Sequence, residues 1–155
     1  MTLTVGDKAP SFSLPDQDCM MHSLSECAGK WTLLYFYPKD ATPGCTIEAQ
    51  TIRDAWPDFT GSDILVFGIS ADSVASHKKF ADKHGLLFTL LADEKKEMVE
   101  AYGVWGKKKL MGREYMGISR TSFLIAPDGT IAKIYEQVKP SEHAAEVLRD
   151  VKALS

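Results

Sequence analysis

Two apolar runs constrain the fold of this chain more than any other feature of its sequence. Residues 31–37 (WTLLYFY) and residues 64–70 (ILVFGIS) are almost entirely aromatic and aliphatic, and each run is bounded by polar or turn-forming residues. Short runs of this kind are typical of β-strands that are covered on both faces, as in sheets that carry helices. We therefore expect an α/β fold.

A helix is expected over residues 43–56, because Thr42 is a favourable N-cap residue and Pro43 is favourable at the first helical position. The other expected elements are an extended or hairpin segment over 18–24, a helix capped by Asp72 or Ser73 and stopped by Gly85, a strand over 86–91, a helix over 94–102, strands over 120–126 and 130–137 around Pro127-Asp128-Gly129, and a last helix from Ser141 to about residue 153. These elements predict an α/β sandwich around a mixed sheet, in one domain over residues 1–155.

Residues 103–119 are the exception to this alternation. They contain several glycines and no clean hydrophobic period, so a long loop is expected there. The basic run at residues 107–109, with Arg113 nearby, is short and is interpreted as solvated loop rather than as a partner-binding patch.

Charge and hydropathy argue against two classes of partner. The formal net charge of −3 at pH 7 indicates neither a nucleic-acid surface nor strong attraction to anionic lipid. Residues 1–15 lack the basic start and apolar stretch of an export signal, and no run is long enough to span a bilayer. We expect a cytoplasmic protein without nucleic-acid or membrane partners, in a compartment that keeps thiols reduced.

The chain has three cysteines, Cys19, Cys27 and Cys45, and an odd number argues against a disulfide scaffold. Buried thiols, a metal site or a reactive thiol remain as interpretations. Cys19, His22 and Cys27 have the spacing of half a zinc site, but no second half follows. No metal and no cofactor are expected.

Cys45 occupies the most reactive position of the three. If Thr42 is the cap, Cys45 lies in the first turn of the helix, where unpaired N–H groups and the helix dipole favour an anion. A thiol there should ionise more readily, and the thiolate is the nucleophilic form. Gly44 is expected to leave room beside the sulfur for a small ligand. The alternative is an inert buried cysteine, and the position alone does not decide between the two.

The segment LYFYPKDATPGCTIEA resembles the peroxiredoxin active-site pattern Pro-x3-Thr/Ser-x2-Cys, and in particular the bacterioferritin comigratory protein, or peroxiredoxin Q, branch. VGDKAPSFSLPDQD, GISADSVASHKKF, LLADEKKEMVEAYGVW and SRTSFLIAPDGTI agree with the same branch, in order, over nearly the whole chain. The resemblance implies a thioredoxin-like fold with extra amino-terminal strands, and a peroxidase that reduces hydrogen peroxide and organic hydroperoxides.

The resemblance also implies roles for three catalytic residues. Cys45 matches the cysteine that attacks the peroxide and becomes a sulfenic acid. Thr42 matches the hydroxyl residue that bonds the thiolate and the peroxide, a role compatible with helix capping. Arg120 matches the arginine that approaches the sulfur and stabilises its charge and that of the peroxide oxygens.

Three further residues are assigned to the substrate pocket. Pro38 matches the proline that shields the thiolate from water, although it also suits a strand end. Gly44 precedes the sulfur. Glu48 lies one turn beyond Cys45, where its charge would oppose the thiolate unless Arg120 or Arg53 pairs with it.

One departure from the family pattern concerns the second, resolving cysteine. Gln50 occupies the position where many members of this branch carry it, and residues 73–84, where another subgroup places it, contain none. Cys19 or Cys27 could bridge to Cys45 only if their Cα atoms approach closely or the chain unfolds locally. We expect instead a one-cysteine mechanism, in a monomer, with thioredoxin, glutaredoxin or glutathione attacking the sulfenic acid.

Two alternative functions are a general thiol–disulfide oxidoreductase and a non-catalytic binding or chaperone module on the same fold. The absence of a C-x-x-C pair argues against the first, and the intact Thr42, Cys45 and Arg120 argue against the second. The apolar residues of the 103–119 segment, namely Trp105, Leu110, Met111, Tyr115 and Met116, are expected to pack on the core; the alternative is that they select organic hydroperoxides or dock the reductant.

Overall fold

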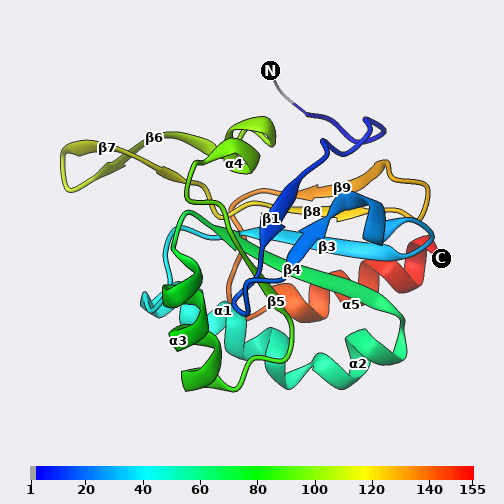
Figure 1. The fold of residues 1–155 in the computed structure, drawn as a ribbon. Coiled ribbons are helices and arrows are strands. Elements are labelled where there is room, and N and C mark those ends of the chain that lie inside the picture. Colours follow the sequence, from blue (N-terminus) through cyan, green and yellow to red (C-terminus); the bar gives the residue numbers. More distant parts are fainter. Residues whose placement is uncertain (1–2) are drawn as a thin grey trace.

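The computed structural model describes residues 3–155 and contains a central five-stranded sheet (Figure 1). The strand order is β5 (Thr89–Ala92), β4 (Ile64–Ser70), β3 (Trp31–Phe36), β8 (Ser122–Ile125) and β9 (Ile131–Tyr135). Strands β5, β4 and β3 are parallel, whereas β8 and β9 are antiparallel to their neighbours. The expected mixed sheet is confirmed, and the two apolar runs form its central strands.

Two clusters of buried side chains cover the two faces of the sheet. Leu33 and Tyr35 of β3 belong to a cluster shared with four helices, α1 (Pro43–Asp54), α2 (Trp56–Gly61), α3 (Val74–His84) and α5 (His143–Leu154). Leu34 and Phe36 belong to the other cluster, shared with α4 (Glu97–Ala101) and the amino-terminal segment. Because successive side chains of a strand point to opposite faces, β3 divides one core from the other.

Two short strands precede the central sheet, as the family resemblance implies. Strand β1 (Ser13–Pro15) pairs antiparallel with β2 (Met21–Ser23), and the 3-10 helix η1 (Leu24–Cys27) follows. The hairpin expected near residues 18–24 is confirmed. Figure 1 shows it lying across the front of the sheet, on the face opposite α1 and α5.

The segment 103–119 is a β-hairpin, so the prediction of a long loop was wrong. Strand β6 (Trp105–Leu110) pairs with β7 (Arg113–Ile118), and the turn residues Met111 and Gly112 have φ values of 52° and 81°. Two successive residues in the left-handed conformation are typical of tight hairpin turns, but methionine is rarely found at such a position, so the sequence does not indicate the turn. Most of the hairpin projects from the body of the molecule, so its strands lack a regular apolar face (Figure 1).

The apolar residues of this hairpin do not share one environment. Trp105 packs against the second core cluster, as expected. Met111, Tyr115 and Met116 are exposed, so the expectation that they pack on the core was wrong. The side chain of Leu110 lies outside the described part of the structure.

Other differences concern the ends of helices. The helix expected over 43–56 ends at Asp54, and α2 begins at Trp56 because Pro57 lacks an N–H and crowds the preceding turn. Ser141 does not cap the last helix: α5 begins at His143, whose N–H is already bonded to the carbonyl of Lys139 in a preceding turn. Ser73, by contrast, caps α3 by accepting from the N–H of Ser76, and Gly85 ends it in the left-handed conformation.

Within the described residues 3–155, the structure contains no helix that is both long and apolar enough to cross a membrane.

Close packing in the centre of the sheet yields a first prediction. A β-carbon on Gly68 would lie 2.7 Å from the Oη and Cζ atoms of Tyr35 and 2.9 Å from Leu90 Cδ2. We expect Gly68→Ala to lower the free energy of unfolding by about 1–3 kcal/mol, because the ring and the leucine must both move. Gly106→Ala is the control, since nothing lies within 4 Å of that β-carbon. Equal stability of the two variants in denaturant titrations would contradict the packing argument.

Candidate active site

Cys45 lies where the sequence places it, at the third position of α1. Thr42 occupies the N-cap with extended backbone (φ −82°, ψ 152°), and Pro43 is the first helical residue. The cysteine therefore lies among the N–H groups of the first turn, at the positive end of the helix dipole. Only 1% of Cys45 is exposed. A cysteine that reacts with a protein partner must be more exposed than this. The site must open for any large reactant.

Arg120 connects Cys45 with Glu48. The arginine lies between β7 and β8; its Nη2 donates to Cys45 Sγ at 3.3 Å, and its Nη1 donates to Glu48 Oε1 at 2.9 Å. Burial lowers the pKa of Arg120, but the thiolate and the carboxylate outweigh burial and raise it, so the guanidinium stays charged. The expected approach of Arg120 to the sulfur is present, and Arg120 rather than Arg53 is the partner of Glu48.

Glu48 is completely buried, and its two oxygens have different surroundings. Oε1 accepts from Arg120, whereas Oε2 has no hydrogen-bond partner among the described residues. Burial raises the pKa of Glu48 to about 7, in spite of the opposing effect of Arg120. The carboxyl group therefore takes up or releases a proton near neutral pH. In its neutral form it does not oppose a thiolate one turn away.

Thr42 caps the helix with its backbone but not with its side chain. Its hydroxyl donates to the carbonyl oxygen of Lys39 at 2.8 Å, and no side-chain cap bond forms. The expected N-cap position of Thr42 is confirmed, and its hydroxyl closes the preceding loop instead of bonding to the first turn. Its expected contact with the thiolate and peroxide stays a prediction.

Gly44 leaves room for Arg120 rather than for an empty ligand space. A β-carbon at this residue would lie 2.9 Å from Arg120 Nη2 and 3.8 Å from Pro140 Cγ. Glycine is therefore needed for the guanidinium to reach the sulfur. Pro38 is half-buried just beyond the end of β3, and its shielding role stays a prediction.

The other cysteines lie apart from this arrangement. Cys27 belongs to the core cluster on the opposite face of the sheet from Cys45, and burial raises the pKa of its thiol. Cys19 is exposed in the turn between β1 and β2. His22, considered above as part of a half zinc site, directs its two ring nitrogens at Asp16 and Glu26, at 2.7 and 3.0 Å.

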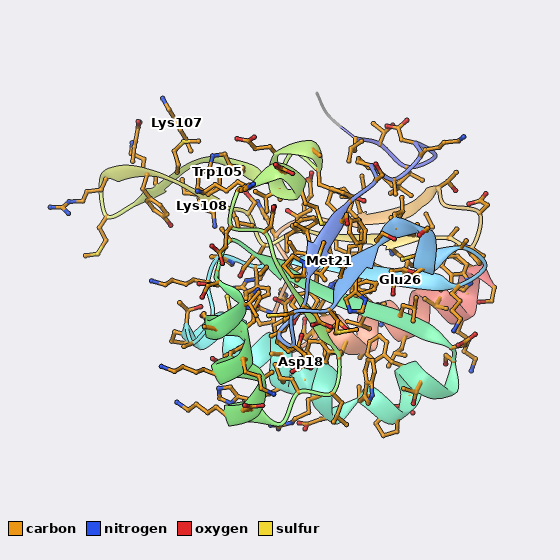
Figure 2. The ribbon with its side chains drawn as sticks, viewed as in Figure 1. Asp18, Met21, Glu26, Trp105, Lys107 and Lys108 are labelled. Atoms are coloured by element: carbon orange, nitrogen blue, oxygen red, sulfur yellow. The ribbon has the colours of Figure 1, made fainter. Side chains whose placement is uncertain are left out.

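Lys108 is a residue near the site that sequence reasoning missed. It lines a pocket of about 450 Å³ together with Ser119 and Arg120, and its Nζ donates to the carbonyl of Ile118. Figure 2 shows Lys107 pointing away from the molecule and Lys108 pointing toward it. Burial, followed by the charge of Arg120, lowers the pKa of Lys108. Strand alternation would have revealed this inward lysine only if the hairpin had been recognised.

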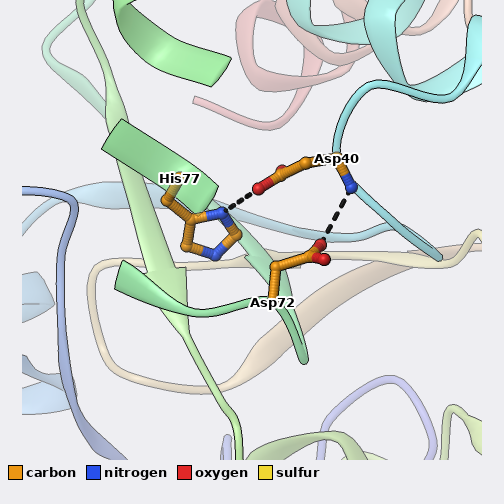
Figure 3. Close-up of side chains that lie close together, drawn as sticks. All are labelled: Asp40, Asp72 and His77. Carbon is orange, nitrogen blue, oxygen red and sulfur yellow. Dashed lines mark hydrogen bonds and ion pairs between the residues drawn. The ribbon is translucent and has the colours of Figure 1, made fainter. Parts of the chain in front are cut away.

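A second missed group lies behind the site, where Asp40, Asp72 and His77 converge (Figure 3). Their ligand atoms all lie within 4.8 Å of one another, a separation compatible with a metal ion. The same atoms are already engaged in hydrogen bonds, which Figure 3 shows in part. We therefore do not assign a metal to them. No local sequence signal pairs residues so far apart in the chain.

The sequence and the fold are both similar to those of known proteins. The model of the AhpC/TSA family matches residues 5–134. The chain is 44% identical to Peroxiredoxin Bcp of Bacillus subtilis over 155 residues, covering 100% of this chain and 99% of the relative. It is 45% identical to Peroxiredoxin Bcp of Escherichia coli K12 over 150 residues, covering 97% and 96% of the two chains.

Solved structures with the same fold include a peroxiredoxin Q variant from Xylella fastidiosa, with a TM-score of 0.93 and 34% identity over 99% of this chain and 98% of that one. Another is the bacterioferritin comigratory protein of Xanthomonas campestris, described by its alkyl peroxide reduction activity. Its TM-score is 0.86, with 35% identity over 92% of this chain and 90% of that one.

The raised pKa of Glu48 predicts a specific pH dependence of stability. The folded-state pKa of about 7 exceeds the ordinary value of 4.5, so Glu48 stabilises the fold fully below about pH 4.5, and this contribution is lost as pH rises through about 7. We expect Glu48→Gln to remove up to about 3 kcal/mol of this decline. Urea titrations between about pH 4 and pH 8, in a Cys45→Ser background that removes the thiol, measure it.

The control for this experiment is Glu142→Gln, which changes an exposed carboxylate. An unchanged pH profile in the Glu48 variant would show that the buried carboxyl group titrates as it does in water.

Proposed function

The chain belongs to the AhpC/TSA family and is a thiol-dependent peroxidase of the bacterioferritin comigratory protein type, and from this we propose that Cys45 is the sulfur that attacks the peroxide. The observation that carries the assignment is the hydrogen bond from Arg120 Nη2 to Cys45 Sγ, at the first turn of α1. Two positive partners, the helix end and the guanidinium, act on one sulfur. Both can stabilise negative charge that lies on the sulfur during the reaction.

The first step consumes one peroxide. The thiolate forms an S–O bond with the terminal hydroxyl oxygen of R–O–O–H, the O–O bond breaks, and RO⁻ leaves and takes a proton to become alcohol or water. The sulfur becomes a sulfenic acid, oxidised by two electrons. Arg120 faces the oxygens on which charge develops, and Glu48, with a pKa of about 7, is able to exchange the proton near neutral pH.

The second step uses an external thiol. The sulfenic acid and R′–SH form a mixed disulfide and release water, and a second thiolate then frees Cys45 and takes the disulfide away. This one-cysteine scheme is supported by the location of Cys27 on the opposite face of the sheet and by Gln50 at the usual resolving position. Thioredoxin, glutaredoxin and glutathione are the candidate reductants, which a cytoplasmic location would supply.

The substrates we propose are hydrogen peroxide and organic hydroperoxides. This proposal is supported by the relative from Xanthomonas campestris, which is described by alkyl peroxide reduction. We further propose a monomer of one domain over residues 1–155, because a single chain supplies Thr42, Cys45, Glu48 and Arg120 together, and both core clusters share the same sheet.

The test of the scheme is intact mass spectrometry after one equivalent of hydrogen peroxide. In wild type we expect a gain of one oxygen on Cys45, followed by a glutathione adduct when glutathione is added. The Cys19→Ser, Cys27→Ser double variant should behave in the same way and keep its peroxidase turnover.

Cys45→Ser is the matched negative control, and it should consume no peroxide. Loss of two hydrogens in wild type, but not in the double variant, would show an internal disulfide and overturn the one-cysteine scheme. Turnover that survives Cys45→Ser would overturn the assignment of the nucleophile.

A further inference from the structure

A buried polar cluster lies behind the loop that leads into α1, and the peroxidase reaction does not use it. Asp40 in this loop accepts three hydrogen bonds through its carboxylate. The donors are Tyr37 Oη at 2.6 Å, His77 Nδ1 at 2.7 Å and Ser76 Oγ at 2.8 Å. His77 and Ser76 belong to α3, so the cluster ties the loop to a different helix.

His77 and Asp40 form a buried hydrogen-bonded pair. His77 is fully buried, with Asp40 Oδ2 2.7 Å from Nδ1 and the carbonyl oxygen of Leu91 2.9 Å from Nε2. Each ring nitrogen therefore faces an oxygen atom, and the two contacts hold the ring between the loop and β5. Burial raises the pKa of Asp40, but the bonds from His77, Tyr37 and Ser76 outweigh burial and leave it lowered.

The loop is held through its backbone as well. The N–H of Asp40 donates to Asp72 Oδ2 at 2.9 Å, and the Ser70 hydroxyl donates to the same oxygen at 2.6 Å. Ala41, the next residue, has φ +63°, a left-handed conformation that costs about 1 kcal/mol or more for a residue other than glycine. Such strain persists only where neighbouring contacts fix the chain, and here those contacts are made by Asp40.

The strained residue leads directly into the helix that carries the reactive sulfur. The carbonyl of Thr42 accepts the first helical hydrogen bond, from Thr46 N–H at 2.9 Å, and Cys45 lies within that turn. If the hydrogen bonds of Asp40 were lost, Ala41 could leave its left-handed conformation. The adjacent N-cap residue, Thr42, would then move as well. The two steps of the reaction need opposite states of this turn. Peroxide attack needs Cys45 against Arg120, whereas the external thiol needs a sulfur that is more than 1% exposed.

We propose that the buried His77–Asp40 hydrogen bond is a positioning clamp that keeps the first turn of α1 closed on Arg120, and that its strength sets the balance between peroxide attack and reduction of the sulfenic acid. His77 and Asp40 are positioning residues, since neither touches the reacting atoms. The proposal rests on the one-cysteine function for its second step.

Two substitutions of His77 separate the clamp from general stability. The amide nitrogen of asparagine can take the place of Nδ1 and keep the bond to Asp40, whereas that of glutamine can take the place of Nε2 and keep the bond to Leu91. In His77→Gln we expect the rate of Cys45 oxidation by hydrogen peroxide to fall about tenfold or more, the scale of one lost bond to a buried charge. Reduction of the sulfenic acid by glutathione should become faster, as should alkylation of reduced Cys45 by a bulky maleimide. His77→Asn should stay nearer to wild type in all three.

Stopped-flow measurement of each step, with denaturant titrations of both variants, makes the test. A residue needed only for stability would change each rate no more than the unfolded fraction from the denaturant titrations accounts for. That result, or equal behaviour of His77→Gln and His77→Asn, would overturn the proposal. Ser76→Ala is a milder variant. It should also slow the oxidation of Cys45 by peroxide and speed the reduction of the sulfenic acid by glutathione. A change of both rates in one direction would count against the clamp.

Failure of the one-cysteine scheme would look different. Wild type would then form an internal disulfide, and no sulfenic acid would remain for glutathione to attack. The maleimide and peroxide rates need no resolving thiol, so they test the clamp in either case.

Discussion

The site depends on the two hydrogen bonds that the guanidinium group of Arg120 donates, one to Cys45 and one to Glu48. One guanidinium nitrogen donates to the sulfur at 3.3 Å and the other to the carboxylate at 2.9 Å, inside a largely water-excluded space. An unpaired buried charge is costly, so thiolate, guanidinium and carboxyl group must be considered as one unit. The carboxyl group of Glu48, with a pKa of about 7, changes its charge near neutral pH.

The sheet brings these groups together. Strand β8 lies antiparallel beside β3, with Ser122 opposite Tyr35, and the N–H of Phe36 donates to the carbonyl of Thr121. Arg120 therefore lies beside the end of β3, the end from which the chain turns into α1. A residue 75 positions away from Cys45 in the sequence is thus placed by backbone pairing, and Gly44 admits its side chain.

Much of this could be predicted from local sequence, and the remainder could not for identifiable reasons. The strands β3 and β4, the turn around Asp128 and the first-turn position of Cys45 all have local signals. The β6–β7 hairpin has no regular buried face, and Met111 does not signal a left-handed turn.

Contacts between distant residues leave no such local trace. Only the family resemblance suggested Arg120 as a neighbour of Cys45, and nothing in the sequence paired Asp40 with His77, 37 positions away.

The most direct test of the role of Arg120 is the rate of Cys45 oxidation by hydrogen peroxide in Arg120→Lys, with Arg113→Lys on the exposed hairpin as control. Lysine keeps the charge but cannot donate to sulfur and carboxylate in a planar fork. The account predicts a loss of about 10²–10³-fold in Arg120→Lys and none in the control; a wild-type rate in Arg120→Lys would contradict it.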